Sequence, residues 1–371
     1  MRFSSIPGQE ETKQHLLREV QSGKISHAQL FLGKPGYGTL PLALALVQYL
    51  FCENRQPTDS CGECPACRKV SELQHPDLHF SFPVVLSIAK KADAFIKDWR
   101  EQVKEQPFFG LYDWIKRIDS SERKPVIGVD EAMEIIRKLN LKSFEGGYKV
   151  MLIWMPEEMN TEAANKLLKI LEEPLPKTLF LLVSESQDKL LATILSRTQV
   201  MRVPMIDTDS LQTALEQRGV PKSTAESAAA RSEGNFIEAL SVLSDKDESD
   251  LNRTLFIQLM RVCFRKDVGL MLDWTDEVST LTKEGQKQFL RYALHMTRQS
   301  LLKNYTDDML TRVSSEEWEF LQNFSRFISN NNAIDFMNLF NDSHYYLERN
   351  AHVRLTFTQL CFQVMRFIHR A

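Results

Sequence analysis

The residues that could do chemistry in this sequence fall into two groups, a glycine-rich loop near the start and a cluster of cysteines after it. The loop is the stretch GKPGYGTL, residues 33–40, which lies between two apolar runs. Gly33 and Gly38 have the spacing G-x-x-x-x-G of a phosphate-binding loop, which joins a strand to a helix. The pattern predicts a loop whose backbone N–H groups could cradle phosphate.

Two side chains that such a loop needs are missing. The phosphate-contacting lysine would stand at Thr39 and the magnesium-contacting hydroxyl at Leu40. Because a hydrogen bond to a charged group is worth about 1.5–3 kcal/mol, the two losses weaken nucleotide binding by about two to four powers of ten. We therefore expect no ATP hydrolysis and no nucleotide on Gly33, Gly36, Gly38 or Thr39. A glycine turn unrelated to nucleotides is the simpler alternative at this point.

The cysteines Cys52, Cys61, Cys64 and Cys67 have the spacing C-x8-C-x2-C-x2-C. Two overlapping C-x-x-C steps with a further thiol suit a tetrahedral Zn²⁺ site with four thiolate ligands. Four ligands leave no open position, so we expect the zinc to be structural. A redox C-x-x-C pair is the alternative, but it does not explain the fourth cysteine.

Composition limits the broad class of protein. The chain has 371 residues, 43% hydrophobic and 26% charged, which suits a globular protein of two or three domains. The net charge of −3 gives no overall basic field for nucleic acid. We find no signal-peptide core near the N-terminus and no apolar run of about 18 residues. We therefore expect a cytoplasmic protein that does not span a membrane.

The elements that must position these residues alternate between strands and helices. Nearly continuous apolar runs predict buried parallel strands, and helices with one apolar face separate them, so we expect a parallel α/β domain. The expected strands are 28–32, 149–154, 178–183 and 199–203. The expected helices are 9–23, 130–141, one that ends at Pro174, and one around 189–195.

The remaining sequence is less regular or entirely helical. Residues 80–124 carry many aromatics among charges; we expect a helix over about 92–105 and aromatics that pack a small subdomain rather than stack on bases. From Pro204 onward apolar residues recur at helical spacing, as at Phe256, Leu259, Met260 and Cys263. Such stripes are core or subunit-packing faces. Cys263 and Cys361 lie on them, and we expect both to be buried.

Two further motifs complete a recognisable pattern. They are NKLLKILEEP, residues 165–174, and Ser196-Arg197-Thr198. With the glycine loop and the cysteines they resemble the AAA+ subunits of the bacterial clamp loader of DNA polymerase III. The resemblance is strong over 1–79 and 125–203 and weak over 204–371, and residues 80–124 look like an insertion.

The resemblance implies three domains. The first is an AAA+-like domain over 1–203, a parallel sheet domain that carries the degenerate loop, the cysteine module (52–67) and the insertion at about 80–124. A small helical lid domain over 204–244 follows. An all-helical collar domain over 245–371 would mediate oligomerisation.

Departures from the family pattern point to a member that does not hydrolyse ATP. The family's ATPases carry an acidic pair where this chain has Trp154 and Met155, and their sensor arginine aligns with Ile237. Together with Thr39 and Leu40, four separate ATPase elements are absent. The resemblance thus implies a stator within a hetero-oligomeric ring, a component of the polymerase holoenzyme without an active site of its own. The implied partners are the gamma/tau ATPase subunits and the delta subunit, and indirectly the sliding clamp and primed DNA.

Arg197 is the one catalytic residue that the resemblance implies. In the family this arginine projects into the ATP site of the neighbouring subunit, and an arginine finger is worth roughly 10³–10⁵ in rate. The usual motif S-R-C is S-R-T here, which leaves Arg197 in place and changes only Thr198.

Two other functions stay open. A catalytically active, gamma/tau-like AAA+ ATPase with an atypical loop would need another cation near Thr39. A zinc-dependent nucleic-acid-binding protein is the other alternative, and the net charge of −3 and the lack of a basic aromatic stripe argue against it.

Overall fold

A computed structural model gives the structure of the chain and describes residues 1–119, 123–244, 246–305, 313, 315–349 and 351–370. The chain forms two compact units. One comprises Met1–Ala225 and Ser232–Ala239, and the other comprises Glu226–Arg231 and Leu240–Ala371. The division into three domains that the sequence predicts stays a prediction.

The first unit contains the strands and the shorter helices. Its strands are β1 (Ala28–Leu32), β2 (Leu78–Ser81), β3 (Lys149–Trp154), β4 (Thr178–Ser184) and β5 (Gln199–Arg202). Its helices are α1 (Glu10–Ser22), α2 (Thr39–Phe51), α3 (Pro65–Ser71), α4 (Ile96–Glu105), α5 (Leu111–Ile118), α6 (Val129–Asn140), α7 (Thr161–Glu172), α8 (Ala192–Leu195) and α9 (Thr208–Gln217). Short 3₁₀ helices are η1 (Phe3–Ser5), η2 (Ala92–Phe95), η3 (Pro156–Glu158) and η4 (Gln187–Lys189).

Among the residues that the structure describes, the second unit contains helices and connecting turns but no strand. Helices α10 (Lys222–Arg231) and α11 (Phe236–Ser244) each have residues in both units. The others are α12 (Lys246–Arg265), α13 (Val268–Ser279), α14 (Lys283–Tyr305), α15 (Ser315–Phe324), α16 (Ala333–Glu348), α17 (Val353–Ile368) and the 3₁₀ turn η6 (Ser325–Phe327).

The five strands form one parallel sheet in the order β2-β3-β4-β1-β5. Leu30 of β1 lies opposite Leu182 of β4 and Val200 of β5, which fixes the register at the centre of the sheet. Every residue of β1, β3 and β4 is buried, as expected for strands that helices cover on both faces. The predicted class, a parallel α/β domain followed by helices, is confirmed.

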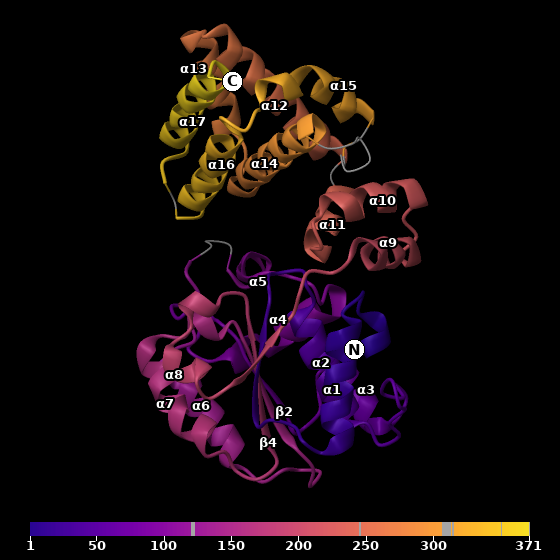
Figure 1. The fold of residues 1–371 in the computed structure, drawn as a ribbon. Coiled ribbons are helices and arrows are strands. Elements are labelled where there is room, and N and C mark those ends of the chain that lie inside the picture. Colours follow the sequence, from indigo (N-terminus) through magenta and orange to yellow (C-terminus); the bar gives the residue numbers. More distant parts are fainter. Residues whose placement is uncertain (120–122, 245, 306–312, 314, 350, 371) are drawn as a thin grey trace. The chain divides into compact units, whose positions relative to one another are not determined.

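Helices cover the two faces of the sheet (Figure 1). On one face α6 and α7 pack with the strands in a single apolar cluster that includes Leu139, Leu167 and Phe180. On the other face α2 contacts β1, β3 and β4. Helix α2 is apolar on all sides, and each of its residues from Thr39 to Leu50 is buried. Helix α2 is therefore a core element of the first unit.

An edge strand of the sheet overlaps the start of residues 80–124, the segment that sequence patterns describe least well. Residues Leu78–Ser81 form β2, which pairs with β3, and sequence analysis did not predict this strand. The aromatics of the segment pack on one another, as predicted. The ring of Trp99 stacks on Phe82 with centroids 4.4 Å apart and meets Trp114 edge-on at 5.4 Å. This aromatic cluster ties α4 and α5 to the edge of the sheet.

The helical unit has its own apolar core. The predicted stripes on α12 and α17 are buried there, with Cys263 and Cys361 among them. Residues 320–328 do not form one continuous helix, because α15 ends at Phe324 and the 3₁₀ turn η6 follows. The side-chain amide of Asn304 donates to the carbonyl oxygens of Ser325 and Ile328, both at 2.6 Å, and so holds this turn.

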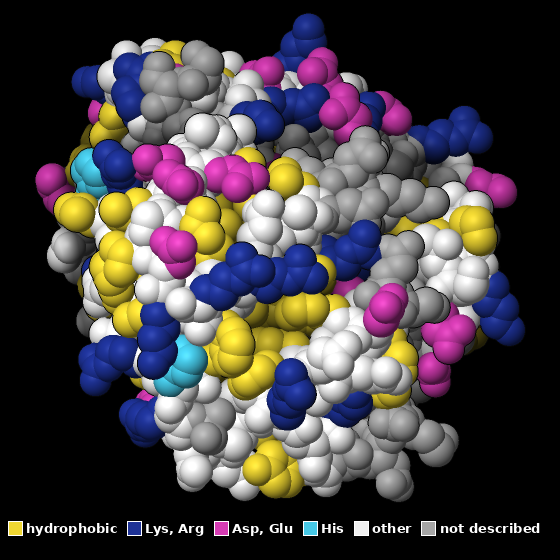
Figure 2. Space-filling view, turned by 90° about the horizontal axis from the view of Figure 1, so that it is seen from above, with side chains coloured by type: hydrophobic (Ala, Val, Ile, Leu, Met, Phe, Trp, Pro, Cys, Tyr) yellow, Lys and Arg dark blue, Asp and Glu magenta, His cyan; other side chains and the backbone are white. Residues whose placement is uncertain are grey.

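The surface of the helical unit has apolar side chains among charged ones. Leu355 is 69% exposed and Ile334 is 63% exposed. Figure 2 shows one face of the molecule, where apolar side chains lie between Lys and Arg and also Asp and Glu. Across the described ranges, we find no helix with the length and apolar character that crossing a membrane requires.

Candidate functional site

The glycine loop has the backbone geometry that the sequence predicts. It follows β1 directly and ends where α2 begins at Thr39. Gly36 and Gly38 have φ of 83° and 94°, a left-handed conformation that favours glycine. The loop thus turns sharply at the N-terminus of a long helix, where backbone N–H groups and the helix dipole favour an anion.

Most of the side chains that line the cavity beside the loop are apolar. Leu40 and Trp154 are 4% and 2% exposed, and Thr39 is 8% exposed. Trp154 closes β3, and the following residue, Met155, is also buried. Among the described residues that line the cavity beside the loop, none is a lysine or arginine. Nothing on these walls could neutralise a phosphate.

Two phenylalanines from the segment between α4 and α5 cover the loop. Phe108 and Phe109 line the cavity and are 5% and 6% exposed. The ring of Phe109 lies 5.0 Å from the ring of Trp154 between centroids. The space that remains is a cavity of about 10 Å³. Sequence patterns did not identify these two residues, because their segment has no periodicity.

A carboxyl group also lines this cavity and was not identified from sequence. Glu185 directly follows β4. Burial and then the carboxylate of Glu157 raise the pKa of Glu185 to about 8. Glu157 accepts hydrogen bonds from the backbone N–H groups of Glu185 at 2.8 Å and Ser186 at 3.3 Å, and burial raises its pKa as well. A phosphate group would meet two acidic residues here.

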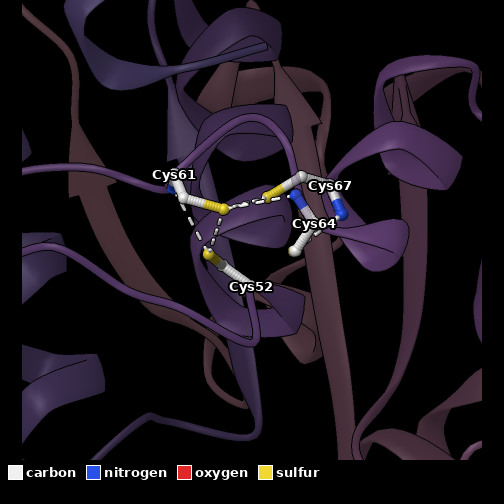
Figure 3. A group of neighbouring side chains, drawn as sticks. All are labelled: Cys52, Cys61, Cys64 and Cys67. Carbon is white, nitrogen blue, oxygen red and sulfur yellow. Dashed lines mark hydrogen bonds between the residues drawn. The ribbon is translucent and has the colours of Figure 1, made fainter.

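The cysteine cluster lies at the other end of α2 (Figure 3). Cys52 follows the last residue of α2, Cys64 is the N-cap of α3, and Cys67 lies in its first turn. The four sulfur atoms all lie within 4.8 Å of one another. The Sγ of Cys52 is 3.6 Å from that of Cys61, which is 3.9 Å from that of Cys67. The four sulfurs could hold one metal ion.

The cluster fits tetrahedral coordination. A zinc–sulfur distance of about 2.3 Å places ligand sulfurs about 3.8 Å apart, close to the two distances above. Backbone N–H groups donate to the sulfurs, from Cys61 to Cys52 at 3.3 Å and from Cys64 to Cys61 at 3.4 Å. Hydrogen bonds from the N–H groups of Glu63 and Cys64 lower the pKa of Cys61 to about 6. Burial raises the pKa of Cys52 and Cys67, so a cation among the sulfurs would favour their thiolate forms.

The histidines near the cluster make contacts with other residues. The ring of His75 stacks on Phe51 with centroids 4.0 Å apart, and its Nε2 lies 3.0 Å from a carboxylate oxygen of Glu145. Asp77 accepts hydrogen bonds from the backbone N–H groups of Phe144 and Glu145 at 2.7 and 2.9 Å. These contacts fix the loop after α6 against the residues that follow α3, and His75 also contacts the end of α2.

Arg197 lies between α8 and β5, where its motif predicts it. Its Nη2 and Nε atoms donate to one oxygen of Glu172 at 2.8 and 3.0 Å, and its Nη1 donates to the carbonyl oxygen of Thr193 at 3.1 Å. The Arg197 side chain is 29% exposed and that of Glu172 is 59% exposed. Arg197 therefore lies apart from the glycine loop of its own chain, held by a surface ion pair.

The raised pKa of Glu185 gives a pH-dependent stability. An unfolded glutamate has a pKa of about 4.3, so between about pH 5 and pH 8 the folded chain holds a proton that the unfolded chain has released. Stability should therefore fall as pH rises through this range. Glutamine has no proton to lose, so Glu185→Gln removes this loss of stability at high pH. The variant should be more stable than the unmodified chain by on the order of a few kcal/mol at about pH 8.5, and by far less at about pH 5.

Thermal unfolding followed by circular dichroism at the two pH values checks this expectation. The exposed Glu53 provides the matched control, since Glu53→Gln should shift the melting temperature equally at both. An equal shift for the Glu185 variant at both pH values would show that this carboxyl is not buried as described.

Comparisons with known proteins agree on one family. A sequence model described as "DNA polymerase III, delta subunit" matches residues 8–207. The DNA polymerase III subunit delta-prime of Bacillus subtilis (strain 168) is 28% identical over 302 residues, which cover 81% of this chain and 77% of that protein. The protein of the same name from Yersinia pestis is 33% identical over 184 residues, 49% of this chain and 43% of that protein.

One solved structure, a DNA polymerase III gamma subunit-related protein from Thermotoga maritima, aligns with a TM-score of 0.42 and 15% identity, over 96% of this chain and 99% of that chain. This chain spans less than half the length of the Yersinia relative. The family model covers more than half of the chain. The chain therefore belongs to the DNA polymerase III delta-subunit family, in which the two bacterial relatives above are named delta-prime.

Proposed function

We propose that this chain is a non-hydrolysing subunit of a bacterial clamp loader, a stator that helps to load the sliding clamp onto primed DNA during replication. The observation that carries the proposal is the glycine loop. It keeps its turn at the start of α2, while Thr39, Leu40 and Trp154 stand where an ATPase has a lysine, a hydroxyl and an acid. The relatives named delta-prime support its place in DNA polymerase III.

The proposed partners are the gamma/tau ATPase subunits and the delta subunit, in a hetero-oligomeric ring in the cytoplasm. Helices over 245–371 would form the collar of that ring. Exposed apolar side chains on this part of the chain, such as Leu355 and Ile334, support a role in packing against other subunits. Contacts with the clamp and DNA would be indirect.

Arg197 is proposed as an arginine finger for the neighbouring subunit. A planar guanidinium can form two parallel hydrogen bonds to phosphate oxygens. In the chain described here it donates to Glu172 instead, in an ion pair with one well-exposed partner. Exposed ion pairs contribute only about 0–1 kcal/mol, so an incoming phosphate could displace Glu172 at little cost.

The cysteine cluster is proposed to hold one structural Zn²⁺. Cys52, Cys61, Cys64 and Cys67 would be the ligands, with no position left for substrate. The ion would join the end of α2 to α3 in place of a larger apolar core. The sulfur spacing and the N–H donors to sulfur support this assignment.

The isolated chain should neither hydrolyse ATP nor bind it tightly. The reason is that no lysine or arginine lines the cavity beside the loop and that Trp154 and Met155 stand where the ATPases of the family have an acidic pair. Equilibrium dialysis with ATP and magnesium, and a phosphate-release assay, measure the two properties. Pull-down of the tagged chain from a cell lysate should recover other clamp-loader subunits. A dissociation constant for ATP in the micromolar range or lower, together with magnesium-dependent turnover, would contradict the stator proposal and favour an active ATPase.

One zinc ion should co-purify with each chain prepared without chelators. Replacing Cys64→Ser should lower the zinc content and lower stability by on the order of a few kcal/mol, because metal binding contributes folding free energy. Elemental analysis and thermal unfolding measure both effects. Glu63→Gln is the control, since the Glu63 side chain is exposed in the same loop and the substitution keeps the backbone N–H that donates to Cys61. A structural metal would be excluded if the unmodified chain, purified without chelators, contained no zinc, or if the Cys64→Ser variant melted like the unmodified chain.

Arg197→Ala should leave folding and assembly unchanged but lower the ATPase rate of the reconstituted complex. The clamp- and DNA-stimulated rate should fall most, since the arginine would stabilise charge that develops during hydrolysis in the neighbour. The loss should be partial, because other subunits would supply their own arginines. Arg197→Lys should restore part of the rate, as an ammonium lacks the planar fork of guanidinium.

Arg202→Ala is the matched control for Arg197. Arg202 is an exposed arginine at the end of β5, and its guanidinium donates to Gln187 at 2.9 Å. The Arg202 variant should hydrolyse ATP at the unmodified rate. If the Arg197→Ala complex also hydrolyses ATP and loads clamps at that rate, Arg197 is a surface residue and acts on no neighbour.

A further inference from the structure

The segment between α4 and α5 lies where the loop would have to receive phosphates. Pro107, Phe108 and Phe109 share one small cavity with Gly36, Gly38, Thr39 and Leu40. A Cβ atom built on Gly38 would lie 3.4 Å from a ring carbon of Phe108, which is van der Waals contact. The remaining cavity of about 10 Å³ has room for roughly one water molecule. The chain itself fills this part of the site.

Phe109 is anchored from behind by the aromatic cluster. The ring of Phe109 meets Trp99 edge-on at 5.6 Å and lies 5.0 Å from Trp154. Trp99 is fully buried, and the indole N–H of Trp114 donates to the carbonyl oxygen of Pro83 at 2.8 Å. Trp154 stands where the ATPases of the family have an acidic residue. The loss of that acid thus provides the apolar surface on which Phe109 packs.

The same segment fastens the start of α11 to the loop. The ring of Phe108 lies 4.6 Å from that of Phe236, the first residue of α11. The backbone N–H of Phe236 donates to the carbonyl oxygen of Gly36 at 3.0 Å. A side chain at Gly36 would collide with Asn235, whose Oδ1 accepts from the N–H of Ile237 at 3.0 Å. Glycine loop, aromatic segment and helix start therefore form one packed joint.

We propose that Phe108 and Phe109 are a built-in replacement for nucleotide, which closes the glycine loop and holds residues 235–239 against it. The inference deepens the proposed function and rests on it for the interpretation of the loop as a former nucleotide site. It adds a cause of nucleotide exclusion that is separate from the missing lysine. It also gives residues 80–124 a role, namely to carry these two rings. A joint held by side chains does not loosen when nucleotide is released or hydrolysed.

The test restores the lysine and the hydroxyl of a phosphate-binding loop, once with Phe108 and Phe109 in place and once without them. One full-length variant carries Thr39→Lys and Leu40→Thr, and a second adds Phe108→Ala and Phe109→Ala. Equilibrium dialysis with ATP should find no tighter binding in the first variant than in the unmodified chain. The second should bind ATP at least about tenfold more tightly, because the lysine can then reach the phosphates. The control adds Phe95→Ala to the first variant, since Phe95 is also a buried phenylalanine of residues 80–124, at the end of η2, but does not line the cavity.

Each outcome decides the proposal. ATP binding by the first variant equal to that of the second would overturn it, as would equal gains from the Phe95 and Phe108–Phe109 changes. A folded second variant that binds no ATP would also overturn it. None of these results would affect the stator proposal, which fails only if the unmodified chain turns over ATP.

Hydrogen exchange measured by mass spectrometry provides a second test that needs only a single substitution. Phe109→Ala should speed exchange in residues 33–42 and 235–239 of the otherwise unmodified chain. Phe95→Ala should leave those two stretches as protected as in the unmodified chain. Unchanged protection in the Phe109 variant, or the same change in both variants, would overturn the proposal.

Discussion

The packing of Phe109 against Trp154 is the interaction on which the rest of the candidate site depends. The N-terminus of a helix after a glycine loop attracts anions, and in an ATPase the anion is the nucleotide. Here aromatic rings cover that helix end, and the neighbouring acids have a raised pKa because water is largely excluded. A lysine at Thr39 would share this largely apolar cavity with Glu185, and burial there disfavours a charged group. The chain thus lacks the lysine of an ATPase and has aromatic rings at this helix end. Both features make the surroundings of the loop less polar.

Helix α2 connects this joint to the cysteine cluster. It begins at Thr39 in the loop and ends at Phe51, a span of about 20 Å at the usual helical rise. At its far end Cys52 joins the sulfur cluster and Phe51 stacks on His75. The backbone N–H groups of Phe3 and Ser4 donate to Asp59 within the cysteine module. One buried helix thus connects the closed glycine loop to the cysteine cluster.

Sequence patterns predicted the elements that a short stretch of sequence is enough to indicate. Strands β3 and β4 are buried apolar runs, the glycine spacing marks the loop, and the close spacing of the cysteines indicates one cluster. Strand β2 was missed because it is four residues long and includes a histidine. The role of Phe108 and Phe109 could not be predicted, since it depends on contacts with Gly38, Trp154 and Phe236, which are far away in sequence. Glu185 has a local signal, a carboxylate directly after a buried strand, but only the fold brings Glu157 beside it.

Arg197 is held less firmly than the glycine loop. This difference fits the proposal that the loop of this chain stays closed while Arg197 acts on the neighbouring subunit. The loop is closed by buried rings, and opening it would expose large apolar surfaces to water. The guanidinium of Arg197 is held by hydrogen bonds to an exposed carboxylate and a carbonyl oxygen, which water or phosphate can replace. A subunit that acts only on its neighbour needs its own site fixed and its outward-facing arginine free to exchange partners. The closed loop and the weakly held arginine together provide that combination.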